Sequence, residues 1–392
     1  MKKFLLAAML LIWMGCKDQD RWAPVGTADS VPSPVTDVQV KNIAGGATIA
    51  YALPDDEAVL YVLAIYSIHD SSNLEKKSSF YNNSITITGF PDTKTYQVKL
   101  YTVSRGEKRS GPVTVNVNPL TPPVTSVFNS IKVDPTFGGI RVSFQNENEA
   151  NVKINVLTTD SLGDLTTADV YYTKRKNGDF SVRGFDSVER KFGIFVRDRW
   201  NNYSDTLFTE QTPWYEEQLD KSKFKEINLP GDTYKPHVGT GMGMLWDDIW
   251  NTGNNVFHTD VGTGIPQWFT FDLGTTVRLS RFKFYHRNAG VPTGAYYAGD
   301  PEVFEVYGSN NPNPQGDWDS TWTLLGHFIS IKPSGQSTPT TEDIQFACVD
   351  GEDFEFSLDD PPVRYLRFKI LKTWGGVSYM YISELTFWGS KL

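Results

Sequence analysis

The chain has 392 residues, of which 14% are aromatic, 32 are glycine and 22 are proline, and its formal net charge is −9. This length exceeds what one small hydrophobic core holds and fits two or three domains. The aromatic and turn-forming residues favour β-rich folds over helical bundles, and the acidic balance gives the chain no electrostatic means of binding nucleic acid.

The first fifteen residues have the pattern of an export signal. Lys2 and Lys3 precede an apolar run over residues 4–14 that is too short to span a bilayer. Gly15 then precedes Cys16, a pair that resembles the cleavage and lipidation site of bacterial lipoproteins. An ordinary secretory signal followed by a chance cysteine is the alternative.

The residues after Cys16 indicate where the protein is anchored. Lys17 and the acidic residues behind it resemble the surface-export tag of Bacteroidota lipoproteins, which implies a lipid anchor on the outer face of the outer membrane. Loss of residues 1–15 leaves 37 − 2 = 35 basic and 46 acidic residues, a charge of −11. Membrane attachment would therefore come from the acyl chains alone. Residues 16–34, with three prolines, are expected to form a polar tether.

Residues 35–119 consist of short apolar segments separated by turns. The segments 61–66 and 96–102 have the composition and alternation of strands. The second segment and the Ser-Gly-Pro turn at 110–112 are similar to the last two strands of a fibronectin type III domain, with Tyr96 at the position of that family's corner tyrosine. The resemblance implies a β-sandwich without clustered chemistry.

Residues 120–227 are expected to form a second β-sandwich followed by a helical connector. The segments 181–185 and 196–205 resemble two domain families, catalogued without a function, that precede discoidin-like modules in Bacteroidota surface lipoproteins. The connector is predicted over 214–223, because its acidic residues come early and its lysines late, as a helix dipole favours. Strands are expected at 140–144, 152–156 and 192–196.

Four segments of residues 228–392 resemble the discoidin (coagulation factor 5/8 type C) family. They are PQWFTFDLG at 266–274, YGSN at 307–310, RYLRF at 364–368 and ISELTFWG at 382–389. The resemblance implies a galactose-binding-like jelly roll that binds ligands, often sugars, through loops at one end. The fold class expected for the whole chain is therefore all-β, with two fibronectin-III/Ig-like sandwiches followed by a discoidin-like β-sandwich.

Seven of the eleven tryptophans lie after residue 228. Trp268, Trp322 and Trp388 match family core positions or lie in predicted strands, so we assign them to packing. Trp250 and Trp374 fall in predicted loops. In the discoidin fold these two loops lie at the same end of the sandwich as the loop over residues 287–297.

The loops contain residue types that recognise sugars. Aromatic rings stack on the C–H face of a sugar, while Arg, His and Asn bind its hydroxyls. Arg287 matches an arginine found in sugar-binding members, and His258 matches the family's Trp-His or Phe-His position. Trp374 is expected to stack, because the two glycines after it would let its ring stand clear of the backbone. The predicted ligand-binding set is His258, Arg287, Asn288, Trp374, Tyr379 and Trp250. Structural roles for Arg287 and His258 in the loop backbone, and a core position for Tyr379, are the alternatives.

The discoidin family often carries a structural Ca²⁺, which needs oxygen ligands. Asp247 matches the aspartate of the family's first loop, Glu384 matches its closing carboxylate, and Asp248 could substitute. The family usually has glycine at the position of Asp248, and the loop to His258 is longer than usual. A calcium site at these three carboxylates and a set of solvated loop carboxylates therefore remain alternatives.

The chain shows no nucleophile elbow, no His-Glu-x-x-His motif and no phosphate loop. Cys348 is left without a partner once Cys16 carries lipid, and we expect it to be a buried small hydrophobic residue. The sequence therefore predicts a non-enzymatic surface lipoprotein that binds glycan through its C-terminal loops and works beside outer-membrane glycan-import proteins. A scaffold or adhesion protein that holds surface partner proteins is the alternative.

Overall fold

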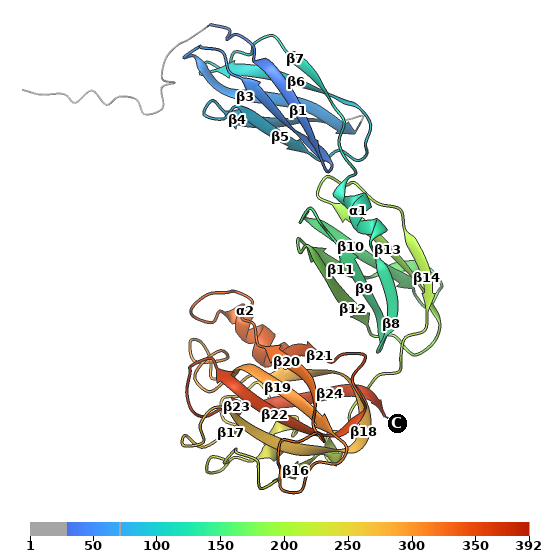
Figure 1. The fold of residues 1–392 in the computed structure, drawn as a ribbon, viewed down its shortest axis with the longest axis vertical. Coiled ribbons are helices and arrows are strands. Elements are labelled where there is room, and N and C mark those ends of the chain that lie inside the picture. The colour runs from blue at the N-terminus through green and yellow to red at the C-terminus, as the bar shows by residue number, and fades with distance from the viewer. Residues whose placement is uncertain (1–29, 70–71, 392) are drawn as a thin grey trace, which may run out of the picture.

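A computed structural model describes residues 30–69 and 72–391. The export signal, Cys16 and most of the tether lie outside the described residues. Three large hydrophobic clusters, one for each successive part of the chain, form separate cores. Figure 1 shows the three units one after another, with the C-terminal unit at the far end from the grey N-terminal trace. In the described part of the chain, no helix has the length and apolar character needed to cross a membrane.

The first unit is a sandwich of a three-stranded and a four-stranded antiparallel sheet. In β5, isoleucines alternate with polar residues, so one face enters the core between the sheets. The hydroxyl of Tyr96 donates to Asp92 Oδ1 at 2.7 Å, which ties the start of its strand to the preceding turn. The strands are β1 (Thr36–Ile43), β2 (Gly46–Ala52) and β5 (Ser84–Thr88) in one sheet, and β4 (Ser72–Ser79), β3 (Val59–His69), β6 (Tyr96–Ser104) and β7 (Val113–Val117) in the other.

The second unit is also a sandwich, and a short helix, α1 (Pro123–Asn129), leads into it. Proline in the first turn suits a helix start, and Val124 and Val127 are buried in the second core. One sheet has the order β12 (Asn177–Arg183), β9 (Gly139–Gln145), β8 (Lys132–Thr136). The other has the order β11 (Leu165–Thr173), β10 (Val152–Thr159), β13 (Arg190–Asp198), β14 (Leu207–Gln211).

The connector is largely extended, so the helix predicted over 214–223 was wrong. Only η1 (Lys221–Lys223) is helical, and Asp220 caps it by accepting from the Ser222 N–H at 3.1 Å. Ahead of it, β15 (Glu217–Gln218) pairs with β24 (Glu384–Lys391) of the third unit. A strand added to a free sheet edge satisfies its backbone groups, which outweighs the local charge pattern that favoured a helix.

The third unit is built on one eight-stranded sheet that includes the connector strands β15 and β16 (Lys225–Ile227). Its longest strand, β18 (Gln267–Tyr285), pairs with β22 in its first half and with β24 and β21 in its second. Gly274, at φ +77°, lies where β18 changes partners. The main sheet also contains β19 (Pro301–Ser309), β20 (Thr323–Ile329), β21 (Glu352–Glu355), β22 (Val363–Thr373) and β24 (Glu384–Lys391).

Shorter elements of the third unit carry the loops. They are η2 (Met242–Leu245), β17 (Phe257–His258), β23 (Tyr381–Ile382), α2 (Thr341–Ile344) and the π-helical turn η3 (Gln345–Gly351). The core beneath them is rich in phenylalanine, including Phe269, Phe271, Phe282 and Phe368, which are fully buried and in mutual ring contact. The chain is therefore all-β, as the sequence predicted.

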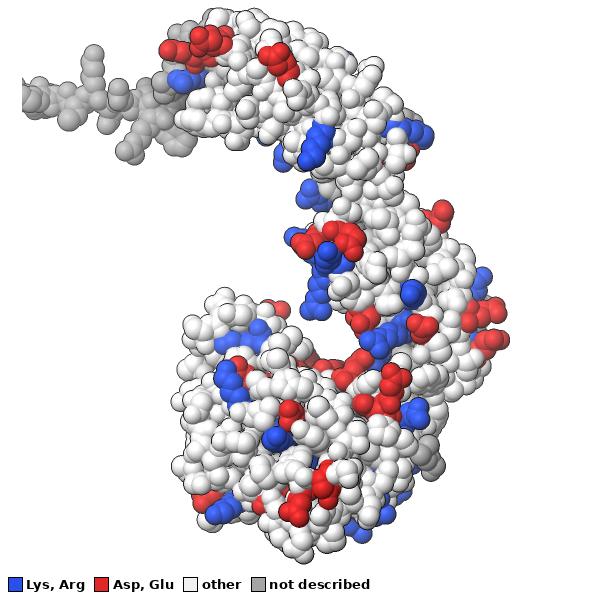
Figure 2. All heavy atoms as spheres, viewed as in Figure 1, with Lys and Arg blue, Asp and Glu red and all other residues white. Residues whose placement is uncertain are grey.

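Ion pairs join the second unit to the third. Glu216 lies 3.3 Å from Arg183 of β12 and 3.4 Å from Arg281 of β18, and it accepts from the Ser280 hydroxyl at 2.6 Å. Arg183 also lies 2.9 Å from Glu355 of β21. Figure 2 shows acidic and basic side chains gathered where the middle unit meets the C-terminal unit. The Glu216 carboxylate, only 9% exposed, is thus shared by two units.

Candidate ligand-binding site

The pairing of β17 with β23 places His258 opposite Tyr381. The His258 ring stacks on Tyr379 at a centroid distance of 5.1 Å and an angle of 17°, and it lies 5.6 Å from the Tyr381 ring. Arg287, just beyond the end of β18, places its guanidinium 5.2 Å from the centre of the Tyr381 ring. The structure therefore brings three predicted site residues, His258, Tyr379 and Arg287, around one tyrosine.

His258 presents a hydrogen-bond acceptor. Its Nδ1 lies 2.7 Å from the Thr259 carbonyl oxygen, which can only accept, so Nδ1 carries the proton and Nε2 does not. Partial burial lowers the pKa of His258; the nearby His237 and Arg287 act in the same direction, and the bond to Thr259 opposes them. The imidazole is therefore neutral near neutral pH. None of the described residues forms a hydrogen bond with Nε2 of His258.

Arg287 presents hydrogen-bond donors in a fixed position. Its Nε donates to the Gly253 carbonyl at 2.7 Å, which orients the guanidinium plane. Within the described ranges, neither terminal nitrogen of Arg287 has a hydrogen-bond partner. The structural role and the ligand-binding role of Arg287 thus both have a physical basis. One edge of its guanidinium group binds a loop carbonyl, and the other edge is free to donate to a ligand.

Asn288 and Trp250 are mainly engaged in holding loops. The Asn288 amide donates to Asn251 Oδ1 at 2.6 Å, and its Oδ1 accepts from the Gly290 N–H at 3.0 Å. Trp250 is 38% exposed, lies 5.1 Å from the Tyr285 ring and donates its indole N–H to the Val349 carbonyl at 3.3 Å. Among the described residues, no hydrogen bond or ring contact joins Trp250 to His258 or Arg287.

The Trp374 ring is partly buried against other side chains. Its ring meets Tyr296 edge-on at 5.1 Å, and Lys332 Nζ lies 5.6 Å from the ring centre. Its backbone N–H donates to the Asp300 carbonyl at 2.8 Å, which directs the ring into a small core with Tyr296 and Cys348. Its indole N–H is buried without a partner in the described structure.

Cys348 lies in that same small core. It is fully buried, and burial raises the pKa of its thiol to about 12. This confirms the prediction of a buried small hydrophobic residue and keeps the group protonated and unreactive at neutral pH.

His286 anchors the Arg287 loop, a role that the sequence did not indicate. It is fully buried, with Nδ1 3.4 Å from Asp300 and Nε2 3.1 Å from Glu352. Burial opposes its charge, but the two carboxylates outweigh burial and raise the pKa of His286 to about 9. Asp300 also accepts from the Tyr296 N–H at 2.6 Å, so one charged cluster fixes both ends of the loop. Only tertiary structure brings these partners together.

The three carboxylates of the expected calcium site bind protein donors instead. Lys221 Nζ lies 2.7 Å from Asp248 Oδ1 and also contacts Glu384. Asp247 accepts from the Asn255 amide and from the Ile249 N–H, each at 3.0 Å. Across the described residues, no group of three or more His, Cys, Asp or Glu side chains is arranged to hold a metal ion. The donor set present here does not fit Ca²⁺.

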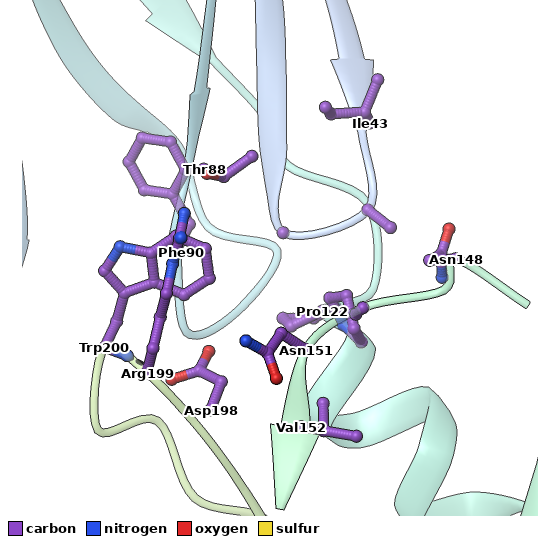
Figure 3. Close-up of a pocket in the computed structure, with 15 residues that line it drawn as sticks. Ile43, Thr88, Phe90, Pro122, Asn148, Asn151, Val152, Asp198, Arg199 and Trp200 are labelled. Carbon is purple, nitrogen blue, oxygen red and sulfur yellow. Dashed lines mark hydrogen bonds between the residues drawn. The ribbon is translucent and has the colours of Figure 1, made fainter. Parts of the chain in front are cut away.

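A cavity of about 400 Å³ lies between the first and second units (Figure 3). Trp200, whose side chain enters this junction, packs against the first core, and a Cβ at Gly89 would lie 3.0 Å from its indole. The Arg199 guanidinium lies 4.2 Å from the Trp200 ring centre, and the Asn202 amide donates to the Gly89 carbonyl at 3.0 Å. Protein contacts thus engage the Trp200 ring, which makes this ring part of the joint rather than a stacking surface.

The fold defines a class: multidomain proteins built from successive β-sandwich units. Models of three domains of unknown function match the chain, DUF4959 at residues 32–119, DUF5126 at 120–222 and DUF5000 at 246–389. A solved SusE-like protein is 36% identical, and the match covers 69% of this chain and 100% of that one, with a TM-score of 0.46. On this identity and coverage, the chain belongs to the family of SusE-like proteins.

Two more distant solved structures resemble parts of the chain. The C-terminal domain of a chitobiase from Bacteroides fragilis is 16% identical with a TM-score of 0.31, and the match covers 45% of this chain and 99% of that one. The GH31 CBM32-2 structure, bound to GalNAc, is 16% identical with a TM-score of 0.28, and the match covers 42% of this chain and 94% of that one. A comparison with curated proteins finds none that matches.

Proposed function

We propose that this protein is a non-catalytic, cell-surface glycan-binding protein that supports polysaccharide utilisation, and that it binds sugar through the C-terminal loops around His258 and Arg287. Membership of the SusE-like family supports the general role. The observation that carries the proposed site is the pairing of a bare acceptor, His258 Nε2, with an anchored fork of donors on Arg287.

This pairing matches the chemistry of neighbouring sugar hydroxyls. A hydroxyl is both donor and acceptor, so one hydroxyl donates to His258 Nε2 while its neighbour accepts from a terminal nitrogen of Arg287. Because both protein groups are already oriented, little side-chain entropy is lost on binding. Tyr379 and Tyr381 supply the apolar floor beneath them.

Tyr297 is the stacking ring that we favour in place of Trp374. It is 51% exposed, and its carbonyl accepts from the Tyr381 hydroxyl at 2.6 Å, which ties its backbone to the floor of the site. Trp374 is instead held in the small core with Tyr296. A planar exposed ring beside hydrogen-bonding groups suits the C–H face of a sugar.

We further propose that the chain is anchored through a lipid on Cys16, faces outward from the outer membrane and works beside glycan-import proteins. The first two units would then carry the binding loops away from the membrane. The ion pairs at Glu216 and the contacts of Trp200 support a spacer with defined joints.

A glycan array probed with the unlipidated mature chain, carrying Cys16→Ser, tests the proposed activity. Glycans that are retained are then titrated by calorimetry with the wild type and with Arg287→Ala. We expect binding that Arg287→Ala weakens strongly, while Arg109→Ala, at an arginine 48% exposed in the first unit, leaves binding unchanged. No retention on a broad array would contradict the proposal. Co-purification with surface proteins regardless of sugar would favour the scaffold alternative.

A further inference from the structure

A lysine ammonium lies where the resemblance to the discoidin family implies a metal ion. Lys221, in η1 of the connector, directs Nζ at Asp248 Oδ1 at 2.7 Å and at Glu384 Oε1. The contact joins the connector to the first loop and to the start of β24. Asp248, which provides one carboxylate, is in a left-handed conformation at φ +63°.

The burial of this lysine sets it apart from its neighbour on the same turn. The Lys221 side chain is 7% exposed, and that of Lys223 is 53% exposed. Glu384 is fully buried, so its charge has little solvent to stabilise it. A buried ammonium and a buried carboxylate are tolerated only as a close pair, because each alone would lose its hydration without compensation.

We propose that the Lys221 ammonium is the resident cation of the Asp248–Glu384 site, so that the first loop is held without a divalent metal. One positive charge balances the buried carboxylate of Glu384 and draws in the more exposed Asp248. Asp247 is excluded from the cluster because Asn255 and Ile249 already donate to its carboxylate. A covalently attached cation cannot dissociate, so chelators leave the loop intact.

This cation also positions the loop that supports Arg287. From Asp248 the loop runs to Asn251, which accepts from the Asn288 amide, and to Gly253, whose carbonyl accepts from Arg287 Nε. Lys221 is therefore a positioning residue for the candidate ligand site. The positioning role of Lys221 rests on the proposed glycan site, whereas its role as the resident cation does not.

Thermal unfolding of the mature chain, measured in EDTA and in excess CaCl2, tests the inference, together with calorimetric titration with Ca²⁺ alone. The wild type is expected to melt at the same temperature in both buffers and to show no Ca²⁺ binding. Lys221→Met keeps the side-chain length and removes the charge, and should melt about 5–10 °C lower in EDTA. Ca²⁺ should restore part of that loss, because the freed carboxylates are oxygen ligands.

The matched control is Lys223→Met, which should behave as the wild type in both buffers. A wild type that binds Ca²⁺ or gains stability from it overturns the inference. So does a destabilised Lys221→Met variant that Ca²⁺ does not rescue, since Lys221 would then be an ordinary ion-pair partner. If Lys221→Met does not fold, the wild-type measurement decides, together with Lys221→Arg, which should remain insensitive to EDTA. If the metal results hold while glycan binding is absent, only the proposed function fails.

Discussion

Replacing His286 with glutamine should remove a defined, pH-dependent part of the stability of the C-terminal unit. Burial opposes the charge of His286, but Asp300 and Glu352 outweigh it and raise its pKa to about 9. A histidine in an unfolded chain titrates near about 6.5. This difference corresponds to about 3 kcal/mol of stability, and leaving buried carboxylates without their partner typically costs about 3–5 kcal/mol.

The sign of the pH dependence follows from the raised pKa. The stabilisation is fully present below about pH 6.5, where both states are protonated, and is lost as the pH rises through about 9. Urea unfolding at about pH 6 and about pH 10, followed by tryptophan fluorescence, measures it. This signal reports mainly the C-terminal unit, because seven of the eleven tryptophans lie after residue 228.

Between these pH values the wild type should lose about 3 kcal/mol more stability than His286→Gln. His327→Gln, at a histidine 48% exposed on β20, should behave as the wild type. Equal losses in the wild type and in His286→Gln would mean that the buried imidazole is not charged, and the reasoning would fail.

Three further predictions concern the site and the joints. Arg287→Lys keeps the positive charge but removes the two-pronged donor group, and should weaken glycan binding about 10–100-fold by calorimetry. Arg109→Lys is the control. Unchanged affinity in Arg287→Lys would show that the guanidinium donors are not used. Glycan affinity should fall at acid pH, below the ordinary range of a histidine, because the pKa of His258 is lowered and protonation removes its acceptor; a constant affinity from about pH 7 to about pH 4 would contradict this. Glu216→Gln should loosen the second joint and broaden the small-angle scattering distance distribution, while Glu217→Gln, which alters only a partly exposed pair with Lys391, should not; identical profiles would show that the joint does not depend on this charge.

Some features of the site were predictable, and others were not. The resemblance to the discoidin family indicated His258 and Arg287, and the structure places both around Tyr381. The packing of the Trp374 ring was not predictable, because the flanking glycines describe only the local backbone. Tyr296 and Lys332, which cover the ring, come from other segments of the chain.

Local patterns also failed where an edge of a sheet was available. The charges of residues 214–223 suit a helix, yet β15 pairs with β24 because extended backbone there gains hydrogen bonds from the sheet. The alternation at residues 96–102, by contrast, was sufficient to predict the strand β6. Val98 and Leu100 are buried and their neighbours Gln97 and Lys99 are exposed, because successive side chains of a pleated strand point to opposite faces.

By itself, the sequence determined the all-β class, several of the strands and the family resemblance, since each depends on residues close together in the chain or on short motifs. Only the tertiary structure decided which side chains face a ligand and which are occupied by the protein. Lys221 and Glu384 are 163 residues apart in the chain. Their contact nevertheless bears on the calcium expectation and on the position of the first loop. Burial makes such a contact decisive, because a charge removed from water must find its partner wherever the fold brings one.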